Sequence, residues 1–133
     1  MAAQHTVQLT AHFERKLEEI EAFLVEAEAP QAFDALLLEL TDTVIPNLQS
    51  FPGMGRLLLE RPAHSVEVAN GMARLTQQLR SLDKDGEVRE YVMSHYLLLY
   101  ARIKGTVYLL SIRHHRQLSF DFEMLEVSQN RGV

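Results

Sequence analysis

Two apolar, β-favouring runs separated by only two residues constrain the fold of this chain more than any other feature. The runs are YLLLYARI, residues 96–103, and TVYLLSIR, residues 106–113, with Lys104 and Gly105 between them. A two-residue connection that contains glycine is typical of a tight β-hairpin, and we expect Gly105 to supply the positive φ that such a turn needs. The chain is therefore predicted to build its core on an antiparallel strand pair.

This turn predicts which residues of the hairpin share a face. Ile103 pairs with Thr106, and the pairing continues outward until Tyr96 pairs with Arg113; opposed residues lie on the same face of a sheet. One predicted face is mainly apolar, and we expect helices to cover it: Leu97, Leu99, Ala101, Ile103, Tyr108, Leu110 and Ile112. The other face is mixed: Tyr96, Leu98, Tyr100, Arg102, Val107, Leu109, Ser111 and Arg113. A slip of one residue would exchange the two faces.

The mixed face has two interpretations. It is either the half-solvated side of an antiparallel sheet, or part of a cationic and aromatic platform for RNA or for an acidic partner. The platform residues on the second interpretation are Tyr96, Tyr100, Arg102, Arg113, His114, His115 and Arg116. The candidates among them for a role in catalysis are Tyr100, Arg113, His115 and Arg116. Adjacent histidines in a strand point to opposite faces, so only His115 is expected to share the face of Arg113.

The spacing of apolar residues before the hairpin predicts three helices. The first is capped by Thr10 and ends at Pro30, the second follows at once and is kinked or restarted at Pro46, and the third covers residues 65–82. The apolar stripe of the first helix is Phe13, Leu17, Ile20, Leu24 and Ala27. The predicted class is α+β: a short N-terminal strand, an αα-hairpin, an additional inserted helix, and a small antiparallel sheet with helices on one face.

Charge and composition exclude several classes of function. The net charge is −5, although residues 91–120 carry four basic and no acidic side chains. Non-specific binding to DNA requires many phosphate-neutralising Lys and Arg residues, so we do not expect it. The chain has no cysteine, and His5, His12 and His64 lack the spacing of metal ligands, so we expect neither metal nor cofactor. We expect no signal peptide and no membrane partner, and hence a cytoplasmic location.

The order of the elements and three local segments resemble the RelE/ParE superfamily of type II toxin–antitoxin toxins. The segments are FERKLEEIEAFL in the first helix, NLQSFPGMGR after the second, and YLLLYARIKGTVYLLSIRHHRQ at the hairpin. Within the last segment, Tyr100 matches the tyrosine of the family's penultimate strand, and His114 and Arg116 match the His-x-Arg that ends the final strand. The resemblance implies a single toxin domain over residues 1–133, in which residues 57–87 look like a helical insertion.

The resemblance also implies a cognate antitoxin and two alternative targets. ParE-like members inhibit DNA gyrase, whereas RelE-like members cleave messenger RNA on the ribosome with basic and tyrosine side chains. Ala101 stands where the nuclease members commonly carry an arginine, and the chain is acidic, so a ParE-like function is favoured. There are two alternatives. The first is an enzyme, namely a ribosome-dependent mRNA interferase. The second is a non-catalytic interaction module with an inactive toxin fold.

Overall fold

The computed structural model of the chain is α+β, as predicted, and describes residues 5–57, 74, 77, 78, 81 and 86–115. Its helical elements are α1 (Ala11–Glu26), α2 (Pro30–Glu39), the π-helix η1 (Leu40–Val44) and α3 (Ile45–Ser50). Its strands are β1 (Thr6–Leu9), β2 (Arg56–Leu57), β3 (Glu87–Val92), β4 (Tyr96–Ile103) and β5 (Thr106–His114). The strands form one sheet in the order β1-β5-β4-β3-β2. The sheet is mixed rather than purely antiparallel, because β1 pairs with β5 in parallel.

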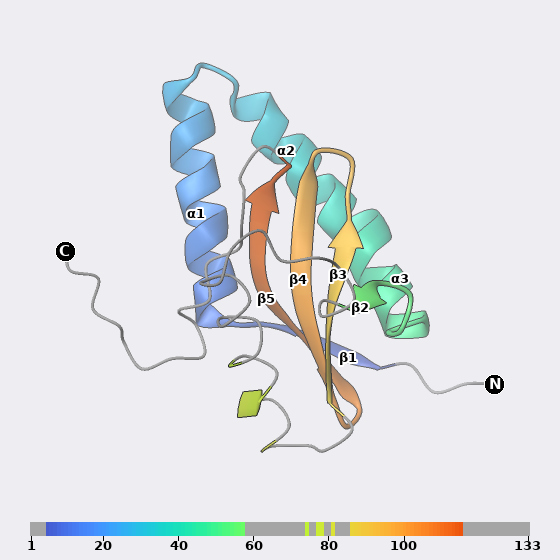
Figure 1. Cartoon of the computed structure of the whole chain (residues 1–133). Coiled ribbons are helices and arrows are strands. Elements are labelled where there is room, and N and C mark those ends of the chain that lie inside the picture. Colours follow the sequence, from blue (N-terminus) through green and yellow to red (C-terminus); the bar gives the residue numbers. More distant parts are fainter. Residues whose placement is uncertain (1–4, 58–73, 75–76, 79–80, 82–85, 116–133) are drawn as a thin grey trace.

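Figure 1 shows α1 beside β5, while α2 and α3 run behind β4 and β3. Thr10 joins the first helix to the sheet. Its hydroxyl accepts a hydrogen bond from the backbone N–H of Phe13 at 3.2 Å and donates to the carbonyl of Leu109 in β5 at 2.9 Å. The predicted N-cap is therefore confirmed, and it also determines where α1 leaves the sheet.

The predicted disturbance at Pro46 is confirmed as a π-helical turn. The backbone N–H of Ile45 donates to the carbonyl of Leu40, five residues back, and α3 continues from there. Proline has no N–H, and its ring clashes with the carbonyl four residues before it. The wider turn relieves this clash without ending the helical path.

The hairpin begins in the predicted register and then departs from it. Ile103 pairs with Thr106 and Tyr100 with Leu109, but Leu110 is an extra residue in β5, so Leu99 pairs with Ser111. This β-bulge shifts all later pairs, and Tyr96 lies opposite His114 instead of Arg113. At the turn, the positive φ of 56° belongs to Lys104 and not to Gly105, which corrects the sequence-based expectation.

The prediction of which face the helices cover was wrong. The core beneath the helices contains Leu98, Tyr100, Val107 and Leu109 from the face predicted to be mixed. The bulge adds Ile112 to this face. The remaining members of this core are Phe13, Phe33, Leu36, Leu40, Val44, Leu48 and Met93. Both faces of the hairpin are apolar enough to be buried, so the handed path of the chain from β1 into α1 decides which one the helices cover.

The opposite face is also buried at its centre, where Leu99, Ala101 and Ser111 have almost no exposed surface. The predicted third helix lies mostly outside the described residues; Arg74, Gln77, Gln78 and Ser81, which belong to it, are helical. Arg116 also lies outside the described residues. The helical insertion over residues 57–87 stays a prediction.

Candidate functional site

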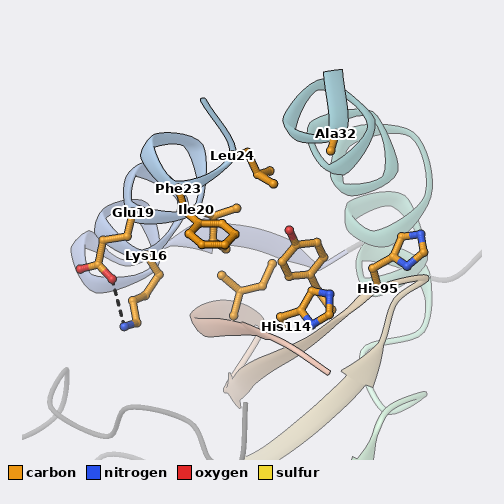
Figure 2. Close-up of a pocket in the computed structure, with 10 residues that line it drawn as sticks. Lys16, Glu19, Ile20, Phe23, Leu24, Ala32, His95 and His114 are labelled. Carbon is orange, nitrogen blue, oxygen red and sulfur yellow. Dashed lines mark hydrogen bonds and ion pairs between the residues drawn. The ribbon is translucent and has the colours of Figure 1, made fainter. Parts of the chain in front are cut away.

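A pocket of about 610 Å³ opens where β4 begins and β5 ends. Figure 2 shows side chains of α1 along one side of this pocket and His95 and His114 on the other. The lining residues are Lys16, Glu19, Ile20, Phe23, Leu24, Ala32, His95, Tyr96, Ile112 and His114. A volume of this size with mostly apolar walls and a few polar groups at the rim is typical of a binding pocket.

Three predicted site residues meet at this end of the sheet. The rings of Tyr96 and His114 pack edge to face, with centroids 5.4 Å apart, and a ring nitrogen of the exposed His115 lies 3.2 Å from the carbonyl oxygen of Tyr96. Burial raises the pKa of the Tyr96 phenol above its ordinary value. The bulge creates this group, because it brings His114 opposite Tyr96.

The turn between β3 and β4 is held against α2 beside the pocket. The backbone N–H and the hydroxyl of Ser94 both donate to one carboxylate oxygen of Glu39, at 3.0 and 3.2 Å. The N–H of Met93 donates to the carbonyl of Tyr96 at 2.8 Å. These contacts position His95 at the rim.

Arg113 does not join the residues at the pocket. It pairs with Leu97 on the opposite face of the sheet, and only 6% of its surface is exposed. The prediction of an open face shared by Arg113, Tyr96 and Tyr100 is therefore wrong. The physical reason is again the bulge, which shifts Arg113 by one residue relative to β4.

Tyr100 lies further along β4, beneath the loop that follows α3. It is 0% exposed, and its hydroxyl donates to the carbonyl of Pro52 at 2.8 Å and accepts from the backbone N–H of Gly55 at 3.0 Å. Burial raises the pKa of its phenol, and the hydrogen bond from Gly55 opposes this shift in part. The hydroxyl is thus occupied in holding the loop.

Charged side chains surround Tyr100 and the loop that it holds. Arg89 donates to the carbonyl of Gly55 and, at 2.9 Å, to the carboxylate of Glu87. The hydrogen bond from Arg89 is the main reason that the pKa of Glu87 lies below its ordinary value. Arg102, which is partly exposed, lies 3.7 Å from the same carboxylate. The predicted residues Tyr100 and Arg102 are therefore together, but apart from Tyr96, His114 and His115.

Sequence analysis did not identify the loop that Tyr100 holds as a functional surface. Phe51, Met54 and Arg56 are exposed on it, and Lys16 and His95 at the pocket were also missed. An aromatic residue, a methionine and an arginine within one Pro-Gly loop were a usable signal, because these residue types are enriched at protein interfaces.

Over the described residues, no His, Cys, Asp or Glu side chains gather in a group of three or more that could hold a metal ion. None of the helices in that part of the chain has both the length and the apolar character of a membrane span.

Comparison with known proteins shows the family. The sequence profile described as ParE toxin of type II toxin-antitoxin system, parDE, matches residues 7–119. The chain belongs to the ParE toxin family. It is thus a toxin of a type II toxin–antitoxin system within the RelE/ParE superfamily, which confirms the resemblance seen in its sequence.

A solved structure similar to this ParE-family chain is that of the toxin–antitoxin complex RelBE2 from Mycobacterium tuberculosis. The two are 18% identical with a TM-score of 0.48, and the match covers 88% of this chain and 98% of the other. A search of curated proteins gave no match.

Proposed function

We propose that this ParE-family toxin arrests growth by inhibiting DNA gyrase and performs no nuclease chemistry. The observation that carries the proposal is the burial of Tyr100, whose hydroxyl is already hydrogen-bonded on both sides to the 52–55 loop. A general acid or base must reach the proton that it transfers. The tyrosine that a nuclease mechanism would use is therefore committed to the fold.

Two further observations support a protein target. Arg113, the second catalytic candidate, is also buried and lies on the other face of the sheet from Tyr100. The net charge of −5 opposes entry into an RNA-walled cavity, because such binding depends on neutralising phosphates. Inhibition of a protein needs only a complementary surface.

The test combines pulse labelling in cells with a purified assay. Within minutes of inducing the toxin alone, DNA synthesis is expected to stop first, and the purified protein is expected to inhibit supercoiling of relaxed plasmid by gyrase. Translation that stops first, together with messenger RNA cleaved in purified ribosomes, would overturn the proposal. Growth that continues unchanged would favour the non-catalytic interaction module.

One observation favours a RelE-like ribonuclease as the second candidate. Tyr96, His114 and the exposed His115 lie together beside the pocket, and histidine is the side chain that most often acts as a general acid or base. On this alternative, His115→Gln abolishes cleavage of ribosome-bound messenger RNA. A cleavage rate unchanged by this substitution would exclude the arrangement.

We also propose that a cognate antitoxin neutralises the toxin and that the pocket at α1 receives one of its apolar side chains. Phe23 is exposed at the pocket, and the outer surface of α1 carries the exposed carboxylates of Glu14, Glu18, Glu21 and Glu26. These charges suit a segment with basic residues beside an apolar one.

Phe23→Ser is expected to weaken antitoxin binding in calorimetry, whereas an unchanged Kd would exclude this docking site. We also propose that the toxin is located in the cytoplasm.

A further inference from the structure

Large apolar side chains are exposed on the loop between α3 and β2. Phe51 is 66% and Met54 49% exposed, and Val92, two residues beyond the β3 partner of Arg56, is exposed as well. Exposed clusters of this kind mark interaction sites when the residues are held in place. Such a site binds at a lower entropic cost when its loop is already ordered by the rest of the molecule.

Four contacts order the loop. The Tyr100 hydroxyl bonds to Pro52 and to Gly55, Arg89 donates to the carbonyl of Gly55, and the N–H of Met54 donates to the carbonyl of Phe51 at 3.1 Å. Gly55 lies so close to β3 and β4 that a Cβ there would stand 2.6 Å from the carbonyl oxygen of Glu90. The loop is thus fixed from beneath by buried groups, and its outward side chains need little further ordering on binding.

Two arginines beside the loop lie on opposite faces of the sheet: Arg56 is on the face of Glu90 and Leu99, and Arg102 is on the face of Tyr100. Arg56 is 58% exposed on its side chain and is held at 3.2 Å by the buried carboxylate of Glu90. Arg102 extends toward Gly53 and is more exposed than its partner Glu87. In each pair the arginine is nearer to solvent than the carboxylate, so a partner meets the positive group first.

We infer that Phe51, Met54 and Arg56, supported by Tyr100, form the surface with which this toxin contacts an acidic, apolar patch of its protein target. This inference rests on the proposed function and adds the surface that performs it. Phenylalanine, methionine and arginine are the residue types enriched at the centres of protein interfaces, whereas lysine is depleted there and is absent from the loop. A surface for RNA would need a longer series of cations than the two arginines present.

The test measures the concentration of purified toxin that halves gyrase supercoiling. The double variant Phe51→Ser with Met54→Ser is expected to raise this concentration at least about tenfold. The matched control is Leu38→Ser on α2, which removes an equally exposed apolar side chain (62%) and is expected to change it by less than about twofold. Arg56→Gln, which removes the charge, is expected to raise it and to reduce its dependence on salt. Equal inhibition by wild type and double variant, with both folded by circular dichroism, would overturn the inference.

A photo-crosslinking residue at position 51 separates failure of this inference from failure of the proposed function. A crosslink to a gyrase subunit supports both. If the wild-type toxin does not inhibit gyrase, the proposed function fails, and the same variants are then compared for growth arrest. Arrest lost in the double variant with a crosslink to another protein keeps the surface, whereas a crosslink to RNA, or arrest unchanged by the substitutions, overturns it.

Discussion

The backbone N–H of Gly55 donates a hydrogen bond to the hydroxyl of Tyr100 at 3.0 Å, across 45 residues of sequence. The same hydroxyl donates to the carbonyl of Pro52, so one phenol closes the loop from both sides. Sequence analysis predicted that Tyr100 contacts a target directly. In the structure it instead positions the loop whose residues we propose to make that contact. Its contribution to function is therefore indirect.

Tyr100→Phe removes only this hydroxyl. The carbonyl of Pro52 and the N–H of Gly55 lose a partner, and the free energy of unfolding is expected to fall by about 1 to 3 kcal/mol in urea denaturation. Tyr108→Phe is the matched control, since it removes from the neighbouring strand a hydroxyl that makes no hydrogen bond to a loop within residues 5–57 and 86–115. Equal effects of the two substitutions would show that the loop does not need the hydroxyl.

Gly55→Ala tests how closely the loop approaches the sheet. The new Cβ would stand 2.6 Å from the carbonyl oxygen of Glu90 and 2.8 Å from the hydroxyl of Tyr100, so backbone must move, at a cost of about 1 to 3 kcal/mol. At Gly105 a Cβ meets nothing within 4 Å, and φ lies outside the left-handed region, so Gly105→Ala is the tolerated control. Thermal unfolding of both variants measures the difference, and a Tm for Gly55→Ala equal to that of the control would contradict the packing described.

Glu87 should make stability depend on acid pH. Its pKa is lower in the folded chain than its ordinary value of 4.5, mainly because Arg89 donates a hydrogen bond to it. The folded state therefore gains stability above the unfolded pKa and loses it as the pH falls from about 4.5 through the folded pKa. In urea denaturation, the stability difference between wild type and Glu87→Gln should shrink over this range. A difference that is the same at pH 7 and at acid pH would contradict the role of the carboxylate charge.

Thr10→Ala should weaken the junction between β5 and α1. The hydroxyl accepts from the N–H of Phe13 at the start of α1 and donates to the carbonyl of Leu109. Loss of an N-cap costs about 1 kcal/mol, and loss of the second hydrogen bond adds to this cost. Thr10→Ser retains the hydroxyl and is expected to restore most of the loss. If chemical denaturation cannot distinguish serine from alanine at this position, the hydroxyl is not what holds the junction.

The local sequence predicted most of the elements correctly, because each of these signals depends on neighbours in the chain. Thr10 caps the first helix, Pro30 separates α1 from α2, Pro46 follows a change in helical geometry, and Lys104 and Gly105 form the hairpin turn. Apolar spacing and backbone chemistry decide such features within a few residues.

The candidate site was predicted only in part. Tyr96, His114 and His115 do lie together, but parity along an unbroken strand placed Arg113 and His115 on the face of Tyr96 and His114 on the other, whereas His114 lies opposite Tyr96. One extra residue, Leu110, is enough to reverse this assignment, and no residue type in that stretch marks a bulge. The support of the 52–55 loop by Tyr100 joins positions that only the folded chain brings together.

By itself, the sequence determined the first two helices, the hairpin and the position of its turn, because propensity, capping and proline act through local contacts. The tertiary structure alone decided which face of the hairpin the helices cover, where Arg113 points, and that the Tyr100 hydroxyl is used to hold the 52–55 loop. Both faces of β4 and β5 are apolar enough to be buried, so hydrophobicity left them nearly equivalent. The path of the chain from β1 into α1 and a single bulge in β5 removed that equivalence.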